Sequence, residues 1–204
     1  MLERIVVVDS ETGGVDPGIH PLISLAAVVL DRGFNVLDTF EVLVNEGDEY
    51  AITEESIAIH GITRPQIQAR GLDPHLVVAQ FHAFLTRFFP KLGGEKVVLA
   101  GHNVHFDRGF LVRLYNLADL EFDRFFSRRM IDAASVYGFL AMAGLVPETD
   151  LSSEAMFRTL GITSSPRSRH DALTDALATA AALGAMIDML AQPRDLRALT
   201  HSNP

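Results

Sequence analysis

The stretch MLERIVVVDSE, residues 1–11, places two charged residues before a short apolar run and a carboxylate directly after it. This order predicts a buried strand over Arg4–Val8 and excludes a signal peptide. Asp9 and Glu11 follow the strand. Because alternate residues of a strand face the same side, both carboxylates should lie on one side, about 7 Å apart along the chain. Buried like charges at this spacing repel unless a cation lies between them. A solvated strand end could also carry two acids, so the pair alone is a weak signal.

Two more apolar, β-rich stretches follow at Leu22–Leu30 and Val36–Val44. The turn-like Asp31-Arg32-Gly33 between them predicts a hairpin, so part of the sheet should be antiparallel. Lys96–Ala100 has the character of another buried strand, and Met130–Asp132 that of a short edge strand. Strands that come first and then alternate with helices predict an α/β fold, with a mixed central sheet of about five strands flanked by helices.

Short helices are expected before residue 73, and Ala133–Leu140 should form another helix. Three longer amphipathic helices are indicated by apolar residues at helical spacing. Their apolar positions are Val77, Phe81, Phe84 and Phe88; Phe106, Phe110, Leu114 and Leu117; and Leu173, Leu177, Ala180, Leu183 (or Gly184) and Ile187. We find no repeat or linker, so we expect one domain over residues 1–190 and a loose C-terminal tail over residues 191–204.

Composition narrows the class of protein. Hydrophobic residues make up 48% of the 204 residues, enough for a sizeable core. The formal net charge of −9 argues against a protein that coats DNA nonspecifically, but it leaves a metalloenzyme open. The absence of cysteine excludes disulfides, thiolate zinc sites and a thiol nucleophile, and it fits a reducing compartment. No apolar stretch approaches the roughly 20 residues of a membrane span, so we expect no membrane contact and a cytoplasmic location.

Two further acids lie near the starts of predicted helices. Asp107 follows a buried strand, and Asp175 lies near the start of the last helix, with His170 five residues before it. Each of these residues could be an ordinary helix acid or a structural histidine. Together, four carboxylates from separate elements are oxygen ligands that suit magnesium or manganese and suit zinc poorly. With one histidine beside them, they form a set that suits two-metal phosphodiester hydrolysis.

Four short segments stand in order along the chain: DSETGGVDP from Asp9, IHGIT from Ile59, GHNVHFD from Gly101 and HDALTDA from His170. The first, third and fourth resemble the three motifs of the DnaQ-like (DEDDh) 3′–5′ exonucleases. IHGIT resembles a further segment of that family, which includes the proofreading (epsilon) subunit of bacterial DNA polymerase III. The resemblance spans residues 9–176 and implies a ribonuclease H-like fold. One departure is Gly13, where many members carry Thr at a loop position on the substrate side.

The resemblance also implies roles for individual residues. Asp9, Glu11 and Asp175 would bind the first of two Mg²⁺ (or Mn²⁺) ions, Asp9 would bridge to the second, and Asp107 would hold that second ion. His170 would accept the proton of the attacking water as the general base, which requires a neutral imidazole. The terminal nucleotide would contact Thr12, His60 and Asn103. For His60, a role in capping a short helix fits equally well.

The expected substrate is the 3′ end of a single strand, and we favour DNA over RNA because the segment Ile59–Thr63 looks most like the proofreading branch. Relatives similar to ribonuclease T and oligoribonuclease carry the same five residues, so an exoribonuclease is the alternative. A noncatalytic nucleic-acid-binding module and a structural divalent-ion site are weaker readings, since no core residue is lost. A polymerase partner is not supported by the tail. Four arginines could contact phosphates or be ordinary surface groups: Arg128, Arg129, Arg167 and Arg169.

Overall fold

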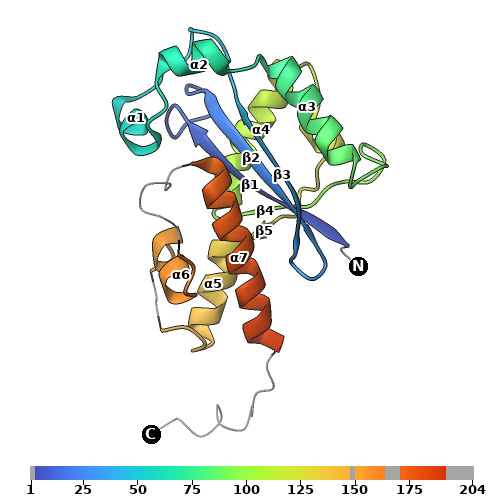
Figure 1. Ribbon diagram of the computed structural model, residues 1–204, viewed down its shortest axis with the longest axis vertical. Helices are drawn as coiled ribbons and strands as arrows, with labels where there is room; N and C mark the ends of the chain where they lie inside the picture. The colour runs from blue at the N-terminus through green and yellow to red at the C-terminus, as the bar shows by residue number, and fades with distance from the viewer. Residues whose placement is uncertain (1–2, 148–149, 164–170, 192–204) are drawn as a thin grey trace, which may run out of the picture.

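The computed structural model describes residues 3–147, 150–163 and 171–191 (Figure 1). A five-stranded sheet with the order β3-β2-β1-β4-β5 forms its centre. The first three strands pair antiparallel, and β4 and β5 add in parallel beside β1, so the predicted mixed sheet is confirmed. The strands are β1 Arg4–Thr12, β2 Leu22–Asp31, β3 Val36–Leu43, β4 Leu99–Gly101 and β5 Ile131–Asp132.

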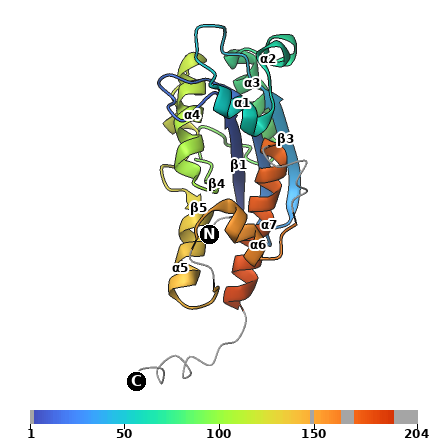
Figure 2. The same ribbon diagram turned by 90° about the vertical axis from the view of Figure 1, so that its left-hand side faces the viewer.

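Helices cover both faces of the sheet (Figures 1 and 2). The helices are α1 Glu54–His60, α2 Arg64–Arg70, α3 Pro74–Thr86, α4 Val104–Leu117, the 3₁₀ turn η1 Phe122–Arg124, α5 Ala133–Met142, α6 Ser153–Thr159 and α7 Ala172–Ala191. One core lies between the sheet and α3 with α4, and the other lies between the sheet and α5, α6 and α7. β2 is buried from Leu22 to Leu30, which accounts for its continuous apolar sequence.

β1 divides its side chains between the two cores. Val6 and Val8 pack with the α3 and α4 side, whereas Ile5 and Val7 pack with the α7 side. Because side chains alternate along a strand, Asp9 continues the phase of Ile5 and Val7 and lies on the α7 side. The first turn of α7 therefore lies on the same side of the sheet as Asp9.

The strand prediction was too short at β1 and too long at β4. β1 extends beyond Val8 because its pairing with β2 continues as far as Thr12, so Asp9 and Glu11 lie within the strand. The predicted strand Lys96–Ala100 is shorter, because Val97 forms only an isolated bridge with Phe126 before β4 begins.

The predicted apolar stripe of the last helix was partly wrong. Leu177 and Ile187 are exposed, by 37% and 45%. Small side chains instead make up most of the buried face of α7, among them Ala178, Thr179 and Ala182. The prediction is therefore confirmed at Ala180 and Leu183, which are buried, and wrong at Leu177 and Ile187.

By length and composition alone, α7 could cross a membrane, with 20 residues and a mean hydropathy of 1.4. A single such helix is weak evidence, since core helices meet the same criteria. α7 packs its buried face into the second core, beside β1 and β2. The boundary expected at residue 190 falls at the end of α7, and the tail at residues 192–204 lies outside the described residues.

Candidate active site

Two of the predicted acids lie side by side on one face of β1. In the antiparallel register with β2, Asp9 is opposite Ala26 and Glu11 is opposite Ser24. Glu11 is buried, with 8% of its surface exposed, and Asp9 is partly buried. The strand therefore holds both carboxylates under the amino-terminal end of α7.

Asp175 completes a group of three carboxylates. One ligand atom from each of Asp9, Glu11 and Asp175 lies within 4.8 Å of the other two. α7 is fixed at this place by Asp171, whose Oδ2 accepts hydrogen bonds from the backbone N and the Oγ1 of Thr174, at 3.2 and 2.7 Å. This is the geometry of an N-cap, and it stabilises the first turn of α7, which carries Asp175.

Asp107 approaches the group from the opposite side of the sheet, in the first turn of α4. It is 4% exposed, and its Oδ1 accepts a 2.6 Å hydrogen bond from the Oγ of Ser10. Asp107 is not one of the three clustered carboxylates, but its charge acts on Asp9. The start of α4 is held by Asp132, whose Oδ1 accepts a 2.7 Å hydrogen bond from the backbone N of Asn103.

Burial and mutual repulsion raise the pKa values of these carboxyl groups. Burial and the charges of neighbouring carboxylates, first that of Asp107, raise the pKa of Asp9 well above its usual value. Burial and the charges of Asp175, Asp171 and Asp107 raise the pKa of Glu11 to about 7. Burial also raises the pKa of Asp107 to about 7, against the opposing effect of the hydrogen bond from Ser10. A bound cation would relieve this repulsion.

The donor set fits a hard divalent cation. Within the described residues, the clustered ligand atoms of Asp9, Glu11 and Asp175 are all carboxylate oxygens, with no sulfur or imidazole among them. Oxygen-only sites favour hard cations of the magnesium, calcium and manganese type over zinc or copper. The raised pKa values supply an independent reason, because ionised acids at this spacing need a counter-charge.

A cavity of about 250 Å³ opens beside the carboxylates. Thr12 and His60, two of the predicted substrate contacts, line it together with Glu11. The large apolar side chains in its lining are those of Val15, Ile59 and Phe106. The Nδ1 of His60 also accepts a 2.9 Å hydrogen bond from the backbone N of Ile62, so this histidine both fixes the end of α1 and lines the cavity.

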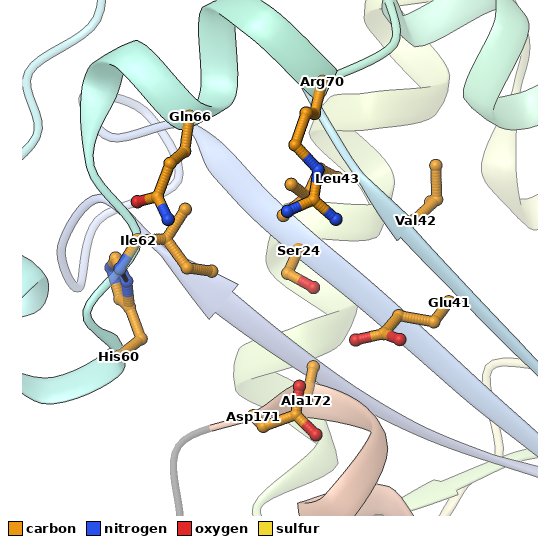
Figure 3. A pocket seen from close by; sticks show the side chains of 10 residues that line it. All are labelled: Ser24, Glu41, Val42, Leu43, His60, Ile62, Gln66, Arg70, Asp171 and Ala172. Carbon is orange, nitrogen blue, oxygen red and sulfur yellow. Dashed lines mark hydrogen bonds between the residues drawn. The ribbon is translucent and has the colours of Figure 1, made fainter. Parts of the chain in front are cut away.

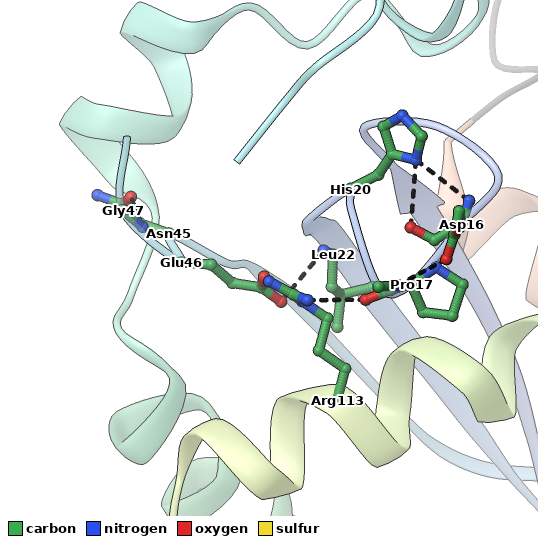
Figure 4. Close-up of polar contacts among 9 residues, drawn as sticks. Asp16, Pro17, His20, Leu22, Asn45, Glu46, Gly47 and Arg113 are labelled. Carbon is green, nitrogen blue, oxygen red and sulfur yellow. Dashed lines mark hydrogen bonds and ion pairs between the residues drawn. The ribbon is translucent and has the colours of Figure 1, made fainter. Parts of the chain in front are cut away.

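The loop after β1 is anchored from α4 (Figure 4). Arg113 donates from Nε to Glu46 Oε2 at 2.8 Å and from Nη1 to the carbonyl oxygen of Pro17 at 2.7 Å. Glu46 Oε1 in turn accepts a 3.2 Å hydrogen bond from the backbone N of Leu22. The side chain of Glu46 is fully buried, and that of Arg113 is 14% exposed. This buried ion pair connects the middle of the loop, at Pro17, and the start of β2, at Leu22, to the helix that carries Asp107.

Gly13 has a structural reason to depart from the family pattern. A Cβ at this position would come within 2.5 Å of Pro21 Cδ and 2.9 Å of the carbonyl oxygen of Ala51. Its backbone N and O are both used, by Pro21 O at 2.9 Å and by Thr53 N at 2.8 Å. Position 13 is therefore enclosed by protein, and a larger side chain would not fit without movement.

Other predicted residues have different surroundings. Asn103 has a left-handed backbone, with φ of 55°, and it is exposed and absent from the lining of the cavity among the described residues. Its role therefore stays a prediction. Arg128 pairs with Asp123 at 2.8 Å. Arg129 is exposed, and its backbone N donates a 3.0 Å hydrogen bond to Ser127 Oγ, so its role also stays a prediction. His170, Arg167 and Arg169 lie outside the described part of the chain.

Some residues at the site were not recognised in the sequence. Ser10 was passed over, although its place between two predicted ligands could have drawn attention to it. Phe106 was assigned to the core stripe of its helix, yet it is partly exposed and lines the cavity. Asp171 was not singled out, and its charge acts on both Asp9 and Glu11.

Several carboxylates lie together at one end of the sheet, beside an open cavity. This arrangement is that of a candidate metal-dependent hydrolase. A family model described as exonuclease, RNase_T, matches residues 6–183. The chain therefore belongs to this exonuclease family, and its sequence motifs place it with the DnaQ-like 3′–5′ exonuclease domains.

Relatives from two groups resemble the chain. A DNA polymerase III subunit epsilon-like protein of Rhodobacter capsulatus is 35% identical over 87% of this chain, but the match covers only 23% of that protein. A ribonuclease T of Yersinia enterocolitica is 26% identical over 86% of this chain and 80% of its own length. Among solved structures, Escherichia coli Exonuclease I in complex with a dA16 oligonucleotide matches with a TM-score of 0.75. It is 22% identical and covers 99% of this chain and 44% of its own, which confirms the ribonuclease H-like fold.

Proposed function

We propose that this chain hydrolyses the terminal phosphodiester bond at the 3′ end of single-stranded DNA and releases nucleoside 5′-monophosphates. The observation that carries the proposal is the convergence of Asp9, Glu11 and Asp175 within 4.8 Å, with buried Asp107 acting on the same group. An open cavity adjoins this cluster, and Glu11 lines it. A phosphate held at the carboxylates would therefore place its nucleoside in the cavity.

In this proposal Asp9, Glu11 and Asp175 would hold one Mg²⁺ or Mn²⁺ ion, and Asp9 with Asp107 would hold a second. Such ions, when bound, lower the pKa of a water molecule and stabilise the departing 3′ oxygen. Ser10 would keep the Asp107 carboxylate oriented, since its hydroxyl already donates to Oδ1 at 2.6 Å. His170 is proposed as the general base from its place in the sequence motif alone.

The cavity beside Glu11 would receive the terminal nucleotide. Thr12 would contribute its backbone, since its hydroxyl is already donated to the carbonyl oxygen of Gly14 at 2.7 Å. Ile59 and Phe106 offer surfaces on which a sugar or base can pack, and such contacts are tolerant of sequence. The chain should therefore accept all four terminal bases.

RNA is the main alternative substrate, and it differs from DNA in the sugar. The relative named as DNA polymerase III subunit epsilon-like supports DNA, whereas the relatives named ribonuclease T support an exoribonuclease. Only contacts to the terminal 2′ position would separate the two substrates. We favour DNA and treat RNA as the second candidate.

The decisive test compares 5′-labelled single-stranded DNA and RNA oligomers of one sequence, each with magnesium and with a chelator. The wild type should shorten DNA stepwise from the 3′ end and should do so faster than RNA, only when magnesium is present. Asp9→Asn and Asp175→Asn should each lose at least about a hundredfold in rate, because each removes a charge from the ligand group.

Asp188→Asn is the matched control, since Asp188 is an exposed acid on the same helix as Asp175. It should keep the wild-type rate. Digestion that continues in chelator, or near-normal turnover by Asp175→Asn, would contradict the metal assignment. If the chain digests RNA faster than DNA, then its proposed substrate is RNA and not DNA. A cytoplasmic location remains a prediction.

A further inference from the structure

A second cavity, of about 300 Å³, lies over β2 and β3 (Figure 3). Its walls come from five elements, β2, β3, α1, α2 and the start of α7, together with the turn after α1. The polar side chains that line it are Ser24, Glu41, His60, Gln66, Arg70 and Asp171. Figure 3 shows Arg70 reaching in from the α2 side, with Glu41 and Asp171 on the side facing it.

The second cavity borders the first cavity and lies close to the carboxylate group. Ser24 lines it and is the register partner of Glu11, which lines the first cavity. Asp171 lines it as well, and it begins the helix that carries Asp175. His60 lines both cavities. A strand that places its terminal nucleotide in the first cavity and its scissile phosphate at the carboxylates would thus direct the next nucleotide toward the second.

The chemistry of the second cavity fits a base better than a phosphate. The carboxyl groups of Glu41 and Asp171 lie close enough to raise the pKa of Glu41, although its burial is the larger cause. Two acids on one wall repel a phosphodiester but accept hydrogen bonds from an amino group. Arg70 faces them and acts on the same Glu41 with its positive charge. A guanidinium donates to carbonyl oxygens and ring nitrogens on a base edge.

We propose that the second cavity binds the base of the penultimate nucleotide and that Glu41 and Arg70 select bases carrying both an amino donor and a hydrogen-bond acceptor. Cytosine, guanine and adenine meet this requirement. Thymine and uracil lack the amino group. This inference rests on the proposed exonuclease function and adds a sequence preference to it, one position upstream of the bond that is cut.

The test uses four 5′-labelled DNA oligomers that end in the same 3′ nucleotide and differ only in the penultimate base. We expect kcat/KM for release of the first nucleotide to be about tenfold higher with cytosine, guanine or adenine than with thymine, within the range of a side chain–base contact. Glu41→Gln and Arg70→Met should each reduce this ratio to within about twofold.

Glu95→Gln and Arg32→Met are matched controls, since both residues are exposed and line neither of these two cavities. Both controls should keep the full preference. The inference is overturned if the wild type cuts all four oligomers at one rate, or if either Glu41→Gln or Arg70→Met retains the wild-type ratio. Equal cutting of the four oligomers leaves the proposed exonuclease standing, whereas no cutting of any of them removes both.

Discussion

Replacing Arg113 by Met should destabilise the folded chain by an amount that the structure allows us to estimate. The substitution leaves Glu46, whose side chain is fully buried, without its cation, and it removes a donor from the carbonyl oxygen of Pro17. It also removes the guanidinium that lies 4.0 Å from the centre of the Tyr50 ring. Breaking a buried ion pair on one side costs about 3–5 kcal/mol of the free energy of unfolding.

The lower end of this range applies, because Arg113 Nη2 is buried without a hydrogen-bond partner among the described residues. We therefore expect a loss of about 3 kcal/mol. For a domain of this size, that loss corresponds to a fall of about 10 °C in the unfolding midpoint. Urea unfolding followed by circular dichroism measures the free energy directly.

Two further variants make this estimate falsifiable. Adding Glu46→Gln to Arg113→Met should recover about half of the loss, because no uncompensated buried charge remains. Lys91→Met breaks the exposed pair with Glu95 and should change stability by under about 1 kcal/mol. The reasoning fails if Arg113→Met costs no more than Lys91→Met, or if the double variant is less stable than Arg113→Met alone.

Three other predictions concern the site itself. In chelator, the free energy of unfolding should fall as pH rises from about 5 to 8, because Glu11 and Asp107, with pKa values raised to about 7, hold protons that the unfolded chain has already lost. Added magnesium should restore more stability at pH 8 than at pH 5, and a flat profile would contradict the pKa assignments. Gly13→Ala should cost about 2 kcal/mol in urea unfolding because of its contact with Pro21, whereas Gly184→Ala, which meets only Phe34 Cβ at 3.5 Å, should cost nothing. Ser10→Ala removes the hydrogen bond that lowers the pKa of Asp107, so calorimetry should find the pH midpoint of Mn²⁺ binding moved upward; an unmoved midpoint would count against it.

Local sequence patterns were enough to predict the sheet and the two acids of β1. The alternation of a strand places Asp9 and Glu11 on one face whether or not the strand ends at Val8. The length of β1 could not be predicted, because its last residues are held by pairing with β2 and not by apolar side chains. α6 was missed for a related reason, since a helix of seven residues leaves little periodic signal.

Local sequence patterns could not predict contacts between residues that lie far apart in the sequence. The hydrogen bond from Ser10 to Asp107 joins residues 97 positions apart, and the pairing of Arg113 with Glu46 joins residues 67 apart. The buried face of α7 was misjudged because Ala178 and Ala182 give no stronger apolar signal than the exposed Leu177. Gly13 was recognised as a departure from the family, but the reason for it depends on Pro21 and Ala51.

We expect Asp9, Glu11 and Asp175, with Asp107 beside them, to bind divalent cations. Anomalous scattering from crystals of the chain grown with manganese tests this most directly. We expect a manganese peak in contact with carboxylate oxygens of all three clustered acids, and a second peak reached by Asp9 and Asp107. Manganese bound at other sites while this group of acids stays empty would contradict the account.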